Sequence, residues 1–129
     1  MGQNYLIDSN VIIDYSSGRL PEKSSNFVEQ IFNCNFLISV IVKIEVLGFD
    51  DVVLKMNAME DFIDMAKILP LDEKVTDTAI KLRRQFKKLK LGDAIIAATA
   101  LEHGLILITR NVADFSSIPN LNILNSHSI

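Results

Sequence analysis

The sequence predicts an α/β fold in which a central, mostly parallel sheet lies between two layers of helices. Short runs of aliphatic residues without polar alternation, such as residues 36–40 and 105–108, are typical of strands buried on both faces. Segments with helical spacing separate these runs along the chain. The core must be mainly aliphatic, because the chain has seven Phe and two Tyr but no Trp. Together these observations favour a three-layer α/β/α arrangement.

Five strands are predicted from the apolar runs. They cover residues 5–7, 36–40, 68–71, 105–108 and 121–124. The third contains Pro70, which has no backbone N–H for an inner ladder, so we expect it at a sheet edge or a strand end.

Helices are predicted between the strands from apolar spacing, caps and glycine stops. They cover residues 11–15, 21–32, 41–47, 52–67, 72–89, 93–103 and 111–115. Ser9 or Asn10 is expected to cap the first helix. The fifth carries an apolar stripe that includes Phe86 and Leu89 and has basic residues on its other face. The sixth has almost no charge in its middle, which predicts burial on most sides.

The composition indicates one globular domain over residues 1–129. Cys34 is the only cysteine, so no internal disulfide forms, and we expect a small core residue in a reducing compartment. No signal peptide is evident at the polar start, and the apolar stretch 36–49 is too short to span a membrane. The prediction is therefore a cytoplasmic protein without a membrane contact.

The net charge of -3 argues against binding nucleic acid through overall charge. The basic residues are nevertheless concentrated, since six of the thirteen fall within positions 81–90. They are Lys81, Arg83, Arg84, Lys87, Lys88 and Lys90. A solvated helix face is the usual meaning of such a strip. The alternative is a surface for a phosphate-bearing ligand, with Arg83, Arg84, Lys87, Lys88 and Lys90 as the candidate contacts.

Four acidic residues are expected at one edge of the sheet. Asp8 follows the first strand, Asp114 follows the fourth, Glu45 lies about one turn after the second, and Asp93 begins an apolar helix. Ligands bind at the carboxyl ends of strands in open α/β sheets. Asp8, Glu45 and Asp93 also lie within apolar sequence, where a half-buried carboxylate is costly unless it is paired or holds a metal.

Carboxylates without His or Cys partners select hard cations, so the predicted cofactor is Mg²⁺ or Mn²⁺. Such a site activates water and stabilises charge on a phosphodiester. Only two His occur and neither is near the acids in sequence, which makes zinc a poor fit; His103 and His127 are expected on the surface. Each acid taken alone also has a structural interpretation. Asp8 and Asp93 fit helix starts, Glu45 fits an ion pair with Lys43, and Asp114 fits a turn.

Several segments together resemble the motifs of PIN domains. Residues 7–14 (IDSNVIID) resemble the first, residues 91–100 (LGDAIIAATA) the third and residues 109–115 (TRNVADF) the fourth. Ser39, Val40 and Ile41 leading to Glu45 resemble the second. Two positions depart from the family pattern. Ser9 replaces the commoner Thr, and Val42 stands where Thr or Ser is frequent, which leaves Glu45 with less polar support.

The resemblance implies a metal site made by Asp8, Glu45, Asp93 and Asp114. Ser9, Asn10, Thr109 and Asn111 would support these acids. It also implies a VapC-like toxin of a type II toxin–antitoxin pair, an endoribonuclease that dimerises and is silenced by an antitoxin protein. Such a complex often represses its own operon, so DNA would be contacted only through the antitoxin.

Three other interpretations remain. In the first, the fold is PIN-like but the acids only position RNA or a protein. A phosphoacceptor receiver domain has similar length and alternation, yet it needs an acid pair after the first strand and a Lys after the fifth. A haloacid-dehalogenase-like phosphatase needs a second acid where Asn10 stands.

Overall fold

The computed structural model describes residues 4–129, and its sheet has the predicted parallel organisation. The strands are β1 (Tyr5–Ile7), β2 (Leu37–Ser39), β3 (Lys67–Leu69), β4 (Ile106–Thr109) and β5 (Ile123–Asn125). Their order is β3-β2-β1-β4-β5, and every neighbouring pair is parallel. Strand β3 lies at the edge of the sheet and ends before Pro70, as expected for a residue without a backbone N–H. The carboxyl ends of all five strands therefore face the same side of the molecule.

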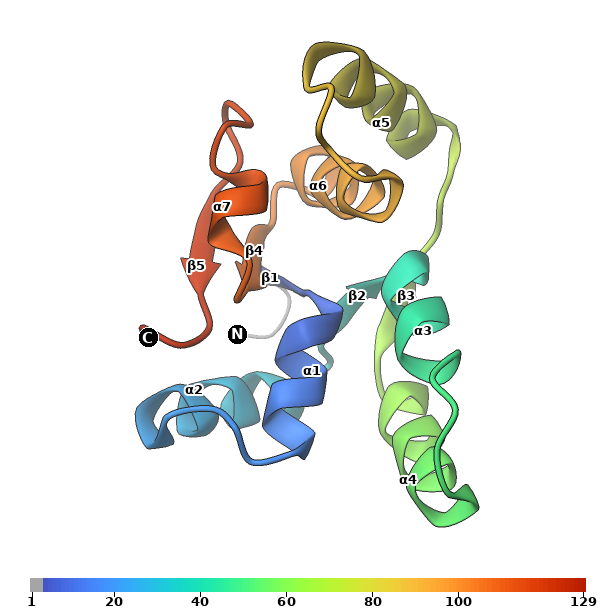
Figure 1. Cartoon of the computed structure of the whole chain (residues 1–129), viewed down its shortest axis with the longest axis vertical. Coiled ribbons are helices and arrows are strands. Elements are labelled where there is room, and N and C mark those ends of the chain that lie inside the picture. Colours follow the sequence, from blue (N-terminus) through green and yellow to red (C-terminus); the bar gives the residue numbers. More distant parts are fainter. Residues whose placement is uncertain (1–3) are drawn as a thin grey trace.

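Seven helices connect the strands of the described chain. They are α1 (Ser9–Ser16), α2 (Glu22–Phe32), α3 (Val40–Leu47), α4 (Val53–Asp64), α5 (Glu73–Gln85), α6 (Leu91–His103) and α7 (Val112–Phe115). Figure 1 shows α5 and α6 on one side of the sheet and α1 and α2 on the other. The predicted three-layer α/β/α class and the predicted order of elements are confirmed.

The core is aliphatic and centres on the inner strands β1 and β4 and on helix α6. Leu6, Ile7, Leu107 and Ile108 are completely buried. Every residue from 94 to 100 is buried, as the uncharged middle of this helix predicted. Four of these seven are Ala, whose small side chains let the helix lie close to the sheet.

The structure corrects several predicted boundaries. Helix α5 ends at Gln85 rather than at residue 89, and α6 begins at Leu91, so Asp93 is its third residue and not its first. The basic residues consequently do not share one helical face. Lys81, Arg83 and Arg84 belong to α5, whereas Lys87, Lys88 and Lys90 follow its end.

Two local predictions are also wrong. Helix α1 is capped by Asp8, whose carboxylate accepts from the Ser9 N–H, and not by Ser9 or Asn10. Cys34 is exposed and not a core residue, because it lies in the turn after α2. Residues 1–3, which entered the prediction of no signal peptide, lie outside the described part. Among residues 4–129 no helix has the length and apolar character needed to cross a membrane.

Candidate active site

Asp8 is the buried centre of a polar cluster at the carboxyl end of β1. Its side chain is only 4% exposed. One carboxylate oxygen accepts from the Ser9 N–H at 2.8 Å. The other accepts from the Thr109 hydroxyl at 2.7 Å and from the Asn10 side-chain amide at 3.0 Å. Burial raises the pKa of Asp8, and these donors oppose the increase because they stabilise the charged form.

Thr109, the last residue of β4, links Asp8 to the loop that follows this strand. Its hydroxyl is fully buried and also accepts from the Asn111 N–H at 3.1 Å. The Arg110 N–H donates to the Asn10 side-chain oxygen at 3.0 Å. Thus Asn10 and Thr109 lie where supporting residues were predicted, whereas Asn111 takes part through its backbone.

Glu45 approaches Asp8 through Ser9. The Ser9 hydroxyl lies 3.3 Å from Glu45 Oε1 and 3.4 Å from Asp8 Oδ1, so it can donate to either carboxylate. Glu45 lies on the more exposed side of α3, whose Val42 and Val46 face the core. Partial desolvation of the carboxylate and the charge of Asp8 raise its pKa. Gly92 of α6 lies beside this side chain, and a Cβ there would stand 3.8 Å from Glu45 Oε2, an ordinary van der Waals contact.

Asp93 is close enough to the other three acids for their charges to affect its pKa. Its pKa is raised to about 6, chiefly by desolvation and then by the negative charges of Asp8, Asp114 and Glu45, while Lys90 acts in the opposite direction. Asp114 lies on α7 and is exposed. Four elements distant in sequence therefore bring their carboxylates within electrostatic reach of one another.

The donor set fits a hard divalent cation that retains water. No three His, Cys, Asp or Glu side chains of residues 4–129 are arranged to enclose an ion by themselves. The acids offer only oxygen donors, and their mutual repulsion would be relieved by a positive ion. Mg²⁺ in particular uses one or two carboxylates and keeps several waters. The residues thus suit Mg²⁺ or Mn²⁺ without forming a closed cage.

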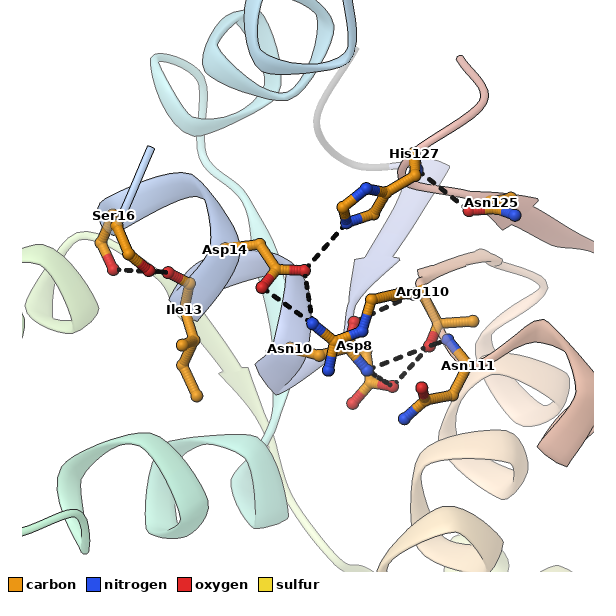
Figure 2. A network of polar contacts seen from close by, with 11 residues as sticks. Asp8, Asn10, Ile13, Asp14, Ser16, Arg110, Asn111, Asn125 and His127 are labelled. Atoms are coloured by element: carbon orange, nitrogen blue, oxygen red, sulfur yellow. Dashed lines mark hydrogen bonds and ion pairs between the residues drawn. The ribbon is translucent and has the colours of Figure 1, made fainter. Parts of the chain in front are cut away.

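A second buried carboxylate, Asp14, lies further along α1, beside Arg110 and His127 (Figure 2). It was not singled out from the sequence. It is 1% exposed, and its oxygens lie 2.9 and 3.0 Å from one Arg110 nitrogen and 3.0 Å from His127 Nε2. His127 was expected to be an ordinary surface residue, but it joins the C-terminal segment to α1. The available signal was an acid within the apolar run 11–15, the same feature that marked Asp8. Arg110 ties Asp14 to the loop that supports Asp8.

The buried Thr109 hydroxyl provides a first test of this network. We expect Thr109→Val to lower a cleavage rate by about 10- to 100-fold, because the carboxylate loses its shortest hydrogen bond. The free energy of unfolding should fall by about 1–3 kcal/mol, since the Asn111 N–H also loses its acceptor. Thr99→Val is the matched control, because the Thr99 hydroxyl is buried but bonds only Ile95 O within α6. Equal cleavage by the two variants would contradict the role given to Thr109.

The candidate RNA contacts divide into two groups. Arg83 and Arg84 are exposed in the last turn of α5. Lys87, Lys88 and Lys90 line a groove of about 480 Å³ that also includes Asp93 and Asp114. Another hollow, of about 530 Å³, lies near the amino ends of β2, β3 and β4 and contains none of the four acids. The groove beside Asp93 is therefore the one that adjoins the carboxylates.

Residues 5–121 match the family model of the PIN domain, so the chain belongs to the PIN domain family. A curated relative, Ribonuclease VapC1 of Rickettsia felis, is 27% identical over 95% of this chain and 96% of its own length. The strand order of the present chain, β3-β2-β1-β4-β5, differs from the 2-1-3-4-5 order of receiver domains, so the receiver interpretation is wrong.

Solved structures with the same fold come from toxin–antitoxin complexes. A chain of the toxin–antitoxin complex from Klebsiella pneumoniae is 30% identical with a TM-score of 0.78, covering 97% of this chain and 99% of its own. A chain of VapBC-1 from nontypeable Haemophilus influenzae is 25% identical with a TM-score of 0.76, covering 95% and 97%. The similarity in each case extends over nearly the whole of both chains.

Proposed function

We propose that this protein is a metal-dependent endoribonuclease, formed by residues 1–129 as one nuclease domain, that hydrolyses RNA phosphodiester bonds. The observation that carries the proposal is the convergence of Asp8, Glu45, Asp93 and Asp114, with Asp8 buried and held by four donors. A merely structural carboxylate gains nothing from three acidic neighbours. The similarity to Ribonuclease VapC1 supports RNA as the substrate class.

The four acids would hold Mg²⁺ or Mn²⁺, which supplies an activated water and charge stabilisation at the phosphate. Ser9, Asn10 and Thr109 hold Asp8 in one orientation and favour its charged form against the effect of burial. Because a protonated Asp93 would be a poor ligand, its raised pKa makes the state of the site depend on pH near neutrality. The chain thus contributes a preoriented, acidic surface whose negative charge a bound cation would neutralise.

The direct test is cleavage of a mixed pool of cellular RNA by the purified chain. Reactions would contain Mg²⁺, Mn²⁺ or EDTA, with Asp93→Asn as the control for contaminating nucleases. Cleavage that requires both the metal and Asp93 supports the proposal. Failure to cleave under either metal, with the protein folded and free of a bound inhibitor, would favour the alternative of a PIN-like RNA- or protein-binding module.

We also propose that the protein is the toxin of a type II toxin–antitoxin pair, acting in the cytoplasm as a homodimer. The similarity to the Klebsiella chain supports an antitoxin partner.

A group of large apolar side chains on and between α3 and α4 is 60–80% exposed, which suits contacts with protein. These are Ile44, Phe49, Val52, Val53 and Leu54. DNA would be contacted only through the antitoxin. Light scattering that finds only monomers at high concentration would contradict the homodimer.

The metal-free protein should lose thermal stability as pH rises from about 4 to about 6. The pKa of Asp93 is raised from 3.8 in the folded state, so folding favours its protonated form and this stabilisation disappears as the group ionises. Calorimetry with EDTA across this range would measure the decrease. It should be smaller in Asp93→Asn than in Asp61→Asn, an exposed acid on α4.

Mg²⁺ should raise the unfolding temperature more at pH 7 than at pH 5, because protons compete for the same carboxylates. An equal effect at both pH values would mean that the ion binds elsewhere.

A further inference from the structure

The early end of α5 changes the direction of the chain beside the candidate active site. Phe86 has an extended backbone (φ -116°, ψ 94°), although its N–H still bonds Leu82 O at 2.8 Å. The turn is closed by the Leu89 N–H, which donates to Phe86 O at 3.1 Å. Residues 86–90 therefore form a compact connection between α5 and α6, which Figure 1 shows next to α6. Lys87, Lys88 and Lys90 therefore lie in this connection and not on α5.

This connection forms one wall of the groove of about 480 Å³. The lining includes Phe86, Lys87, Lys88 and Lys90 from the connection, with Asp93 and Asp114 from α6 and α7. Pockets that hold small organic ligands have volumes of about 300–1000 Å³, so one nucleotide fits this space. The groove leads directly to two of the four acids.

The chemistry of the wall matches a nucleotide. Lys87 and Lys88 are exposed, and within residues 4–129 neither forms an ion pair with a carboxylate. Phe86 is only partly buried: it packs against the core and is also one of the residues that line the groove. An aromatic surface beside unpaired cations is the combination that binds unpaired bases and their phosphates.

We propose that this groove is a subsite for one unpaired nucleotide of single-stranded RNA, next to the phosphodiester that lies at the carboxylates. The base stacks on Phe86, and Lys87 and Lys88 contact the flanking phosphates. This inference rests on the proposed function and adds a nucleotide contact made by Phe86, Lys87 and Lys88. Bases in a duplex are stacked on each other and are not available to an aromatic side chain, so duplex RNA is excluded.

Binding is measured with a short single-stranded RNA by fluorescence anisotropy in an Asp8→Asn background, which prevents cleavage. Asn keeps one acceptor oxygen for the Ser9 N–H that caps α1, and Asn and Asp are equally good helix caps. Phe86→Leu keeps an aliphatic contact with the core and should weaken binding by about tenfold. Lys87→Gln/Lys88→Gln should reduce the slope of log affinity against log salt by about 1.4, as expected for two lost phosphate contacts on a single strand.

The matched control is Lys74→Gln/Lys81→Gln. It removes the same charge from exposed positions of α5 that do not line the groove. Its affinity and salt dependence should equal those of the background protein. Equal effects of the two double variants would overturn the subsite, because they would show that only net charge matters.

Stacking is separated from phosphate binding with an RNA that carries abasic sites. Phe86→Leu should weaken binding of the normal RNA but leave binding of the abasic RNA unchanged, whereas the lysine variant should weaken both. Loss of affinity for both RNAs in Phe86→Leu would overturn the stacking role. Binding of duplex RNA as tight as single-stranded RNA would do the same.

The outcomes distinguish this inference from the nuclease proposal. Wild-type cleavage of RNA with no effect of the groove variants on KM would leave the nuclease and overturn the subsite. Groove-dependent RNA binding without any metal-dependent cleavage would support the subsite and overturn the nuclease. Groove variants that bind RNA normally but fail to bind a co-expressed antitoxin would assign the groove to the protein partner and overturn the inference.

Discussion

Asp93→Asn should reduce metal-dependent RNA cleavage by about a thousandfold while making the metal-free protein more stable. The loss corresponds to about 4 kcal/mol of transition-state stabilisation, which is in the range of a bound metal ion's contribution. The gain follows from the position of Asp93, where burial and three acidic neighbours raise its pKa to about 6. A neutral amide of the same shape removes that repulsion.

The measurement pairs single-turnover cleavage in Mg²⁺ with thermal unfolding in EDTA at pH 7. Asp61→Asn, on the exposed surface of α4, serves as the control and should change neither quantity. Retention of cleavage by Asp93→Asn would exclude it as a metal ligand. Loss of cleavage together with lower stability would instead indicate a damaged fold, and the assignment would then depend on Asp8→Asn.

Arg110→Met should destabilise the fold by about 3 kcal/mol, the largest stability effect that we expect from a single exposed side chain. Arg110 is 46% exposed, but its partner Asp14 is 1% exposed and would keep only His127. A buried carboxylate that loses its cation costs several kcal/mol, even where the intact pair contributes little. Urea denaturation of the variant and of the wild type measures the change, as a shift of the midpoint concentration with an unchanged m-value.

The double variant Asp14→Asn/Arg110→Met tests the cause. It removes the buried charge together with its cation, so it should be more stable than Arg110→Met alone. If the double variant is the less stable of the two, the destabilisation comes from lost packing of the Arg110 side chain. His127→Gln, which removes only one hydrogen-bond partner of Asp14, should cost about 1 kcal/mol.

Features that depend on local pattern could be predicted well. The order of strands and helices and the parallel sheet follow from apolar runs and helical spacing, and both are confirmed. Asp8 could be found because it is an acid directly after a buried strand. Its roles as metal ligand and catalytic group, like those of Glu45, Asp93 and Asp114, stay predictions.

Other features could not be predicted because distant segments decide them. The surroundings of Glu45 are one example, because its carboxylate meets the Ser9 hydroxyl, 36 residues away along the chain. The partners of Asp14 lie 96 and 113 residues away along the chain, so no local pattern could identify them.

The sequence by itself determined the α/β class, the succession of elements and the family motifs, since each depends on residues close together in the chain. Only the tertiary structure decided the positions of Lys87, Lys88 and Lys90 relative to the acidic residues. Helical spacing continues through Phe86 and Leu89, yet α5 stops at Gln85 and the connection to α6 folds back beside α7. Packing of Leu89 against the core outweighs helix propensity at this position, because a single residue's propensity is worth less than burial of a Leu side chain. That packing brings Lys87 and Lys88 to the groove beside Asp93 and Asp114.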